Sequence, residues 1–219
     1  MKYPVLYSFR RWPFAIRARM ALSIARITIE LREILLKDRP TSLFEISPKG
    51  TVPVLRTADK TFEESMDIIY WALDHSNKLE VFFDNKETQK KLIKQNDNEF
   101  KKWLDRYKYH SRNKQYSIEE CKNNAGQIID KYEKKLTKSK YLINNRIQIS
   151  DISIFPFIRQ FAFVDMEYFN MSYPKTSVWL HGIIASKLFK SVMSKYEVWT
   201  PSSKPHIINF AIDNWIKKI

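Results

Sequence analysis

The stretch that most constrains the fold runs from Ser47 to Asp67, where a turn, two short strands and the start of a helix follow one another. Within it, Pro53 begins an apolar strand and lies between two valines. Because proline cannot donate a ladder hydrogen bond, this position fits the first residue of an edge strand. A trans bond from Val52 to Pro53 is the ordinary expectation for such a residue, and a cis bond is the alternative.

The pair Glu64 and Ser65 stands between a short strand, Thr61–Glu63, and a helical pattern that continues to about Ser76. This position predicts that Ser65 is the N-cap of the helix. The N–H groups and the positive dipole end of a helix start also suit a ligand carboxylate. Ser65 can therefore cap its own helix or help to hold an anionic ligand.

Composition excludes several kinds of functional site. The chain has 219 residues and one cysteine, which excludes an internal disulfide and a multi-cysteine zinc site and predicts a reducing, cytoplasmic location. Its three glycines cannot form a dinucleotide fingerprint or a phosphate-binding loop, so no nucleotide cofactor is expected. The four histidines are far apart in the sequence, so no metal site is expected. No signal peptide or membrane span is expected either, because no apolar run approaches about 18 residues.

The formal net charge of +14 favours anionic partners in general. The lysines are nevertheless dispersed, and they alternate with Glu and Asp along helical patterns, as on a solvated surface. Since neither a basic stripe nor a nucleic-acid-binding motif accompanies the charge, nucleic acid is not an expected partner.

The N-terminal part of the chain reads as a βαβ pattern followed by a ββα pattern. Strands are predicted over residues 3–8, 27–36, 51–55 and 61–63, and helices from Pro13, from Ser42 and from Ser65. The first two strands are expected to pair in parallel through their crossover helix. Ser42 and Glu45 predict a capping box for the short second helix. Residues 1–76 are thus predicted to form a thioredoxin-like domain.

The remainder of the chain has a different character. Residues 77–86 are predicted to be a polar linker, and residues 87–219 to be an all-helical domain. The tail carries Phe210 and Trp215 and is expected to dock onto the protein. The predicted fold class is therefore α+β, with a thioredoxin-like N-terminal domain followed by an all-α domain.

Two long helices of this second domain have clear signals. Ser117 and Glu120 predict a capping box for the first, whose apolar stripe includes Cys121. Cys121 is accordingly expected to be a buried, inert thiol. The second begins near Ile149 and is apolar nearly all round, so we expect it to be the central helix.

A thioredoxin-like domain with Val-Pro-Val-Leu, then Glu-Ser at a helix start, then a helical domain, resembles the cytosolic glutathione S-transferase superfamily over essentially the whole chain. The segment Trp12–Arg19 is similar to the first-helix signature of its omega-like and tau-like branches, of bacterial type. Each motif alone is weak, and their order and spacing together are specific. The resemblance also implies a homodimer and a role in detoxification.

The resemblance implies a glutathione-binding site. Pro53 would be cis, and the backbone of Val52 would pair with the cysteinyl backbone of glutathione. Glu64 and Ser65 would hold the γ-glutamyl end, and Arg39 would meet the glycyl carboxylate. Glutathione would thus be the co-substrate, with no metal and no nucleotide.

The resemblance also assigns Asp151 to the capping box of a helix in the second domain, with a role in folding rather than in catalysis. Gln148 replaces the usual Ser or Thr of that box. The cap should therefore be weaker than in the family.

One departure from the family concerns catalysis: Trp12 stands where those branches place their catalytic Cys or Ser. An indole can neither form a mixed disulfide nor donate a hydroxyl hydrogen bond to a thiolate. Ser8 and Tyr7, at the end of the first strand, are the remaining hydroxyl candidates, and Arg11 is the candidate charge. Tyr7 can equally be a core aromatic of a buried strand.

Two functions are consistent with these features. The first is an enzyme, a glutathione transferase that conjugates glutathione to a small hydrophobic electrophile, or reduces the electrophile with it. The candidate electrophile-site residues are Trp12, Trp103, Tyr107 and Tyr116. The alternative is a non-catalytic binding or regulatory scaffold with the same fold, which the replacement at Trp12 and the net charge of +14 both favour.

Overall fold

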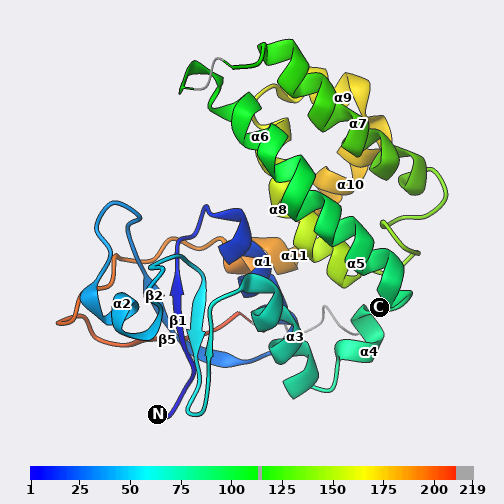
Figure 1. Cartoon of the computed structure of the whole chain (residues 1–219). Coiled ribbons are helices and arrows are strands. Elements are labelled where there is room, and N and C mark those ends of the chain that lie inside the picture. Colours follow the sequence, from blue (N-terminus) through cyan, green and yellow to red (C-terminus); the bar gives the residue numbers. More distant parts are fainter. Residues whose placement is uncertain (113–114, 211–219) are drawn as a thin grey trace. The chain divides into compact units, whose positions relative to one another are not determined.

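The computed structural model describes residues 1–112 and 115–210. The chain divides into two compact units (Figure 1). The first combines Met1–Leu79 with the chain from Ser186 onward, and the second is Glu80–Ala185. The chain therefore returns to its first unit after completing the helical one.

The first unit is built on a five-stranded mixed sheet. Its elements are β1 (Val5–Ser8), α1 (Pro13–Ala25), β2 (Thr28–Glu33), α2 (Thr41–Ile46), β3 (Val54–Arg56), β4 (Thr61–Phe62), α3 (Ser65–His75), α11 (Lys187–Val192) and β5 (His206–Asn209). The strand order is β4-β3-β1-β2-β5, with β1 parallel to β2 and antiparallel to β3. The predicted α+β class and the parallel first pair are confirmed.

Alternation along β1 sends its side chains to the two faces of the sheet. Val5 and Tyr7 join a buried cluster with Leu43 of α2 and Val54 of β3. Leu6 and Ser8, both fully buried, point to the opposite face, and α1 and α3 pack together there (Figure 1). The end of β1 is therefore enclosed from both sides.

Helix α1 starts where the sequence predicts, with Pro13 at its first position. Its C-cap residue is Arg26, which adopts a left-handed conformation with φ 57°. Almost every residue of α1 is buried, including Arg17 and Arg19, whose exposed fractions are 2% and 0%. Because burying a charge is costly unless it is paired, these two arginines must have partners.

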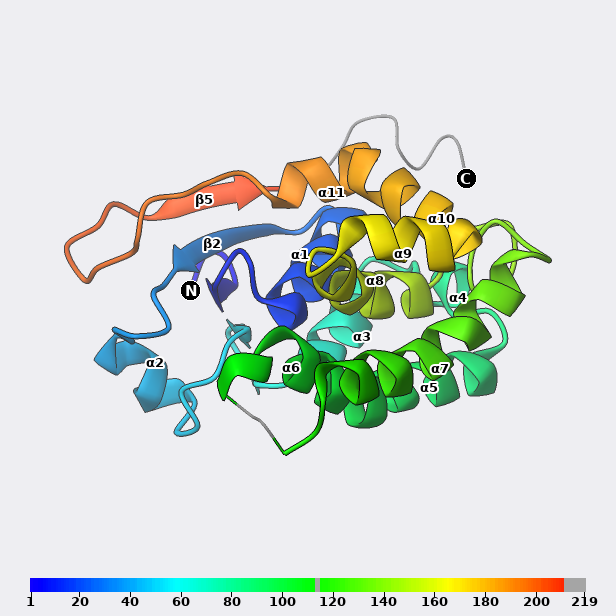
Figure 2. The ribbon, with the colours of Figure 1, turned by 90° about the horizontal axis from the view of Figure 1, so that it is seen from above.

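The expectation that residues 87–219 are entirely helical is wrong at β5, which pairs antiparallel with β2 (Figure 2). In this pairing Ile208 lies opposite Ile29. The strand is too short for local periodicity to identify it, and it forms because β2 otherwise presents open backbone groups at the sheet edge. Phe210 is buried, as expected of a docked tail, whereas Trp215 lies outside the described residues.

Two predicted helix caps in the first unit do not form. Pro40, not Ser42, is the N-cap of α2, and the Ser42 hydroxyl instead accepts a hydrogen bond of 2.9 Å from Tyr7. Glu64 is the N-cap of α3, and Ser65 is its first helical residue. In both cases a tertiary partner takes the hydroxyl that local capping rules assign to the helix.

The second unit contains helices around a buried central one. Its elements are α5 (Lys86–Gln95), the π-helical segment η1 (Asn96–Phe100), α6 (Lys101–Lys108), η2 (His110–Arg112), α7 (Ile118–Leu136), α8 (Ile149–Ala162), α9 (Met166–Ser172) and α10 (Pro174–Ala185). A short helix, α4 (Leu79–Phe82), falls within the predicted linker. Helix α8 packs against α5, α6, α9 and α10 and is buried nearly all round, which confirms its central place (Figure 2).

The predicted capping box of α7 is confirmed. The backbone N–H of Glu120 donates to Ser117 Oγ at 3.1 Å, and the Glu120 carboxylate accepts from the Ser117 N–H at 2.7 Å. Cys121 follows directly and is fully buried, and this burial raises the pKa of its thiol. A buried thiol with a raised pKa is unreactive, which agrees with the prediction for Cys121.

Asp151, near the start of α8, is fully buried and accepts three hydrogen bonds. The backbone N–H groups of Leu142 and Gln148 and the indole Nε1 of Trp179 each donate to its carboxylate at 2.9 Å. The side-chain oxygen of Gln148 accepts from Gln89 Nε2 and from the backbone N–H of Asp84, each at 3.1 Å. Burial nevertheless raises the pKa of Asp151 to about 6, although these hydrogen bonds act to lower it.

We predict that Asp151→Asn changes the pH dependence of stability. A raised folded-state pKa means that the carboxyl contributes most below its unfolded value, and this contribution is lost as pH rises from about 3.8 to about 6. The wild-type advantage over the Asn variant in unfolding free energy should therefore be larger at pH 4 than at pH 7, by about 2 kcal/mol. Urea unfolding of both proteins at the two pH values measures it, and an advantage that grows with pH would contradict the assignment.

Candidate functional site

The first part of the candidate site is the loop that leads into β3. The Val52–Pro53 peptide bond is cis, as the resemblance implies, and both residues are buried. Upstream, Gly50 has φ +58°, and a Cβ added there would lie 2.3 Å from a ring carbon of Phe44. The left-handed backbone at this turn therefore favours glycine.

The loop is tied to the start of α3 by two side-chain contacts. Ser47 Oγ donates to the Glu63 carboxylate at 2.6 Å, and Lys49 Nζ lies 3.4 Å from the Glu64 carboxylate. The second pair is well exposed, so it adds little stability. Glu64 itself makes no side-chain cap hydrogen bond to α3. Its carboxylate therefore stands at the surface beside the helix start and the cis-proline loop.

Ser65 is buried and contacts a residue that sequence reasoning did not select. Arg17 of α1 donates from Nε to Ser65 Oγ at 2.9 Å, and its guanidinium lies 4.8 Å from the centre of the Phe14 ring. This contact joins α1 to the first turn of α3. The signal that could have identified Arg17 is its position in an otherwise apolar helix, where a charge requires a partner.

Tyr7 is a buried core aromatic, with an exposed fraction of 2%. Its hydroxyl donates to Ser42 Oγ and accepts a hydrogen bond from Arg32 of β2. The Arg32 guanidinium also lies 4.3 Å from the centre of the Trp199 ring, which meets the Tyr7 ring edge-on at 6.0 Å. Tyr7 is thus part of a cluster that joins the sheet to the C-terminal segment.

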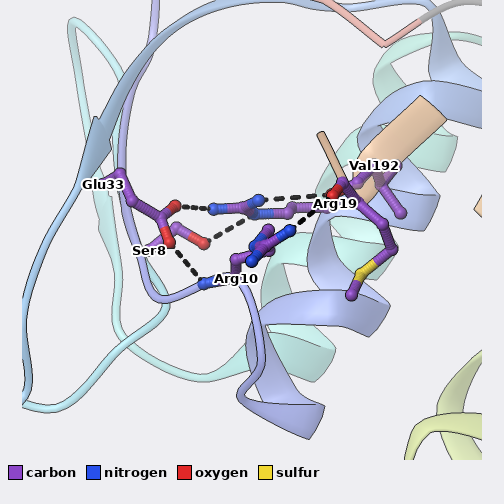
Figure 3. A network of polar contacts seen from close by, with 6 residues as sticks. Ser8, Arg10, Arg19, Glu33 and Val192 are labelled. Carbon is purple, nitrogen blue, oxygen red and sulfur yellow. Dashed lines mark hydrogen bonds and ion pairs between the residues drawn. The ribbon is translucent and has the colours of Figure 1, made fainter. Parts of the chain in front are cut away.

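Ser8 belongs to a second buried network, drawn in Figure 3. Arg19 of α1 donates from Nε to Ser8 Oγ at 2.8 Å and forms an ion pair with Glu33 at the end of β2. The Glu33 carboxylate also accepts the backbone N–H of Arg10 at 2.6 Å. Neither Arg19 nor Glu33 was among the predicted site residues.

The same network holds the segment that returns from the second unit. Arg19 Nη1 donates to the carbonyl of Val192 at 3.2 Å, and Arg10 Nη1 donates to the carbonyl of Met193 at 3.0 Å. These carbonyls lie at the end of α11, where the helix dipole favours a cation. Burial lowers the pKa of the Arg19 guanidinium, and the Glu33 carboxylate opposes that shift. Arg19 therefore links β1, β2 and α11.

Three further candidates in the first unit lie nearer the surface. Arg11 is exposed, with its guanidinium 5.9 Å from the centre of the Phe9 ring. Trp12 is half-buried and is the N-cap residue of α1. Arg39 is exposed in the segment that leads into α2.

The aromatic candidates of the second unit divide into two groups. Trp103 and Tyr116 meet edge-on at 5.2 Å between ring centres, and Arg106 lies 4.6 and 4.4 Å from the two rings. Tyr107 is buried and packs against Phe161 at 5.0 Å. The structure thus brings Trp103 and Tyr116 together and places Tyr107 in the core.

Two further observations concern metal binding and membrane spanning. Within residues 1–112 and 115–210, no group of three or more His, Cys, Asp or Glu side chains is placed to hold a metal ion. None of the helices in the described part of the chain has the length and apolar character that crossing a membrane requires.

The first unit has a thioredoxin-like core with a cis proline before β3, and the second unit is helical, which together define the architecture of a glutathione transferase. A family model described as the glutathione S-transferase N-terminal domain matches residues 6–79, and one described as the C-terminal domain matches residues 64–187. The chain belongs to the glutathione S-transferase family. Comparison with curated proteins finds no sequence match.

Solved structures share the fold at low sequence identity. A glutathione transferase from Phanerochaete chrysosporium, in complex with oxidized glutathione, has a TM-score of 0.75 and 18% identity, covering 87% of this chain and 94% of that one. A family member from Pseudomonas fluorescens with two glutathione bound has a TM-score of 0.74 and 15% identity, covering 88% and 92%. Glutathione S-transferase-I bound with lactoylglutathione has a TM-score of 0.72 and 19% identity, covering 87% and 98%.

We predict that the buried pair is strongly coupled. Arg19→Met should lower the unfolding free energy by about 3–5 kcal/mol, because it leaves the Glu33 carboxylate buried without its cation. The double variant Arg19→Met/Glu33→Met should lose less than the sum of the two single variants. Chemical unfolding of the four proteins measures the coupling, and additive losses would show that the pair does not act as a unit.

Proposed function

We propose that the protein binds glutathione on its first unit and conjugates it to a small hydrophobic electrophile, or reduces the electrophile with it. The observation that carries the proposal is the cis Val52–Pro53 loop tied to the start of α3, with the Glu64 carboxylate at the surface beside it. Family membership supports the same function, as do the similar structures that contain glutathione or its derivatives.

The binding roles follow from complementary groups. The backbone of Val52 would pair with the cysteinyl backbone of the ligand. The Glu64 carboxylate would take the ammonium of the γ-glutamyl end, while Ser65 and the positive end of α3 would take its carboxylate. Arg39 would meet the glycyl carboxylate. Charge-assisted hydrogen bonds of this kind are the strong ones in a small-molecule site.

Activation of the glutathione thiol requires its pKa to fall by about two units from about 8.5. Arg11, which is exposed, and the N-terminal end of α1 would supply positive potential for the thiolate. Ser8 is the candidate hydroxyl: its oxygen accepts from Arg19, and its own proton would be donated to the thiolate. Tyr7 is the second candidate hydroxyl. Trp12 is the proposed apolar contact of the electrophile within the first unit.

One observation favours the alternative, a non-catalytic glutathione-binding scaffold. The hydroxyls of Tyr7 and Ser8 are both buried and both engaged by arginines, and the indole of Trp12 stands at the start of α1. If the protein is such a scaffold, these residues only stabilise the fold. A homodimer, a cytoplasmic location and a detoxifying role belong to the enzyme proposal and rest on family membership.

Retention on glutathione resin and turnover of a generic aryl halide with glutathione distinguish the two functions. Retention with turnover supports the enzyme, and retention without turnover supports the binding scaffold. Failure of both would overturn glutathione binding itself. Sedimentation of the purified protein measures the proposed dimer in the same preparation.

We predict that Glu64→Gln weakens glutathione binding by about 10- to 100-fold, because it removes one charge-assisted hydrogen bond of about 1.5–3 kcal/mol. The side chain is exposed, so the fold should be unaffected. Glu45→Gln is the matched control, since it makes the same change at an exposed position of α2. Calorimetric titration measures the glutathione affinity of both variants. Equal affinities would show that Glu64 does not contact glutathione. Ser65→Ala is a poorer test, because it also removes the acceptor of Arg17.

We also predict that Trp12→Cys creates thiol-transferase activity and a mixed disulfide with glutathione visible by mass spectrometry. The new thiol would stand at the N-cap of α1, where the dipole and Arg11 favour a thiolate, so its pKa should fall below about 8.5. Trp12→Ser is the control, with the same loss of volume and no thiol. A folded Cys variant that binds glutathione, yet has an ordinary thiol pKa and forms no mixed disulfide, would show that position 12 is not the family's catalytic position.

A further inference from the structure

The loop before β3 carries a lysine whose side chain reaches the start of α3. Lys49 Nζ lies 3.4 Å from the carboxylate of Glu64, a residue 15 positions further along the chain. The two side chains are 63% and 68% exposed, and an ion pair this exposed contributes little to stability. The pair can therefore exchange its contacts for those of a ligand at little cost to the fold.

The backbone segments that carry this pair are anchored. Ser47 is fully buried, its Oγ donates to the Glu63 carboxylate at 2.6 Å, and its carbonyl accepts the backbone N–H of Gly50 at 2.8 Å. Lys49 lies inside this turn, and Glu64 directly follows Glu63. Two exposed charges of opposite sign are thus held next to each other by a buried serine.

The start of α3 carries more negative charge than the helix dipole offsets. Glu63, Glu64 and Asp67 all lie at this end of the helix, whereas the dipole is equivalent to about half a positive charge there. A ligand carboxylate that approached Ser65 would be repelled by these side chains. Binding a carboxylate at this helix start therefore requires a cation nearby.

Arg17 and Lys49 both contact the start of α3, and they differ in exposure. Arg17 is 2% exposed and donates to Ser65 Oγ at 2.9 Å, so it serves the interior of the unit. Lys49 is exposed and contacts Glu64 at the surface. Of these two cations, Lys49 is the one that can reach a ligand.

We propose that Lys49 is a further glutathione-binding residue, which takes the α-carboxylate of the γ-glutamyl end. The inference rests on the glutathione binding proposed above. The γ-glutamyl end carries an ammonium and a carboxylate on one carbon, and Glu64 and Lys49 present the two opposite charges side by side. The ligand ammonium replaces Lys49 at the Glu64 carboxylate, and Lys49 meets the ligand carboxylate together with the N–H groups of α3.

This exchange makes the site selective for a free amino-acid end. Binding replaces one exposed ion pair within the protein by two charge-assisted contacts with the ligand. A ligand that lacks either the ammonium or the carboxylate forms only one of these contacts. Lys49 and Glu64 therefore recognise different groups of glutathione, and each can be tested with an analogue that lacks its group.

Calorimetric titration with glutathione and two analogues tests the proposal. The 4-aminobutyryl analogue keeps the ammonium and lacks the carboxylate of the γ-glutamyl end, and the glutaryl analogue keeps the carboxylate and lacks the ammonium. Lys49→Gln should weaken the binding of glutathione and of the glutaryl analogue about tenfold, and should leave the 4-aminobutyryl analogue within about twofold of wild type. Glu64→Gln should weaken glutathione and the 4-aminobutyryl analogue and spare the glutaryl analogue.

Two further variants serve as controls, and circular dichroism checks that each variant keeps the fold. Lys60→Gln is matched to Lys49→Gln, since it removes an exposed lysine between β3 and β4 whose Nζ lies 4.9 Å from the centre of the Phe62 ring. It should leave all three affinities unchanged. Lys49→Arg keeps the positive charge and should retain most of the affinity for glutathione.

The outcomes separate this role of Lys49 from a structural one. Equal losses of glutathione and of the 4-aminobutyryl analogue in Lys49→Gln would overturn the proposal, because they would show that Lys49 only positions Glu64. An unchanged glutathione affinity in Lys49→Gln would also overturn it and would leave the proposed function intact. A wild-type protein that binds no glutathione would overturn both.

Discussion

The first unit depends on one buried ion pair, between Arg19 of α1 and Glu33 at the end of β2. A buried charge without its partner would strongly destabilise the fold, so each of the two residues requires the other at this position. Through its remaining donors Arg19 also reaches Ser8 and the carbonyl of Val192. A single guanidinium thereby sets the distance between the central strand, its neighbour and the C-terminal segment. Ser8, one of the residues proposed to act on glutathione, belongs to this network.

Local sequence signals predicted those parts of the fold that local chemistry determines. Pro13 begins α1, and Ser117 and Glu120 cap α7, because these effects depend on residues within one turn. The cis bond at Pro53 followed from the resemblance rather than from residue type. Ser42 was assigned wrongly because a distant hydroxyl, Tyr7, competes successfully for its side chain. Capping rules consider only neighbours in sequence, and this competitor is a neighbour only in space.

In the candidate site too, the sequence predicted what neighbouring residues determine and missed what distant residues determine. Glu64 and the Pro53 loop could be selected from the sequence because they belong to a contiguous motif. Arg19 and Glu33 could not, since the rule that buried charges must pair gives no partner until the topology is known. The strand β5 was missed for a related reason: its four residues carry no strong period, and they become a strand by pairing with β2. The sequence identified Ser8 as a candidate hydroxyl. It could not predict the hydrogen bond from Arg19, because that contact depends on the tertiary structure.

The discontinuous first unit has a consequence for the order in which the protein can be made. The residues of β5 follow the entire second unit in the sequence, so a growing chain presents β2 as an open sheet edge while the helical unit is synthesised. During that interval the carbonyl acceptors of α11 have not yet reached Arg19. The helical unit has only contiguous residues and can be completed first. The domain that begins the chain is therefore the last to be finished, and its final strand closes an edge through which nascent copies could otherwise associate.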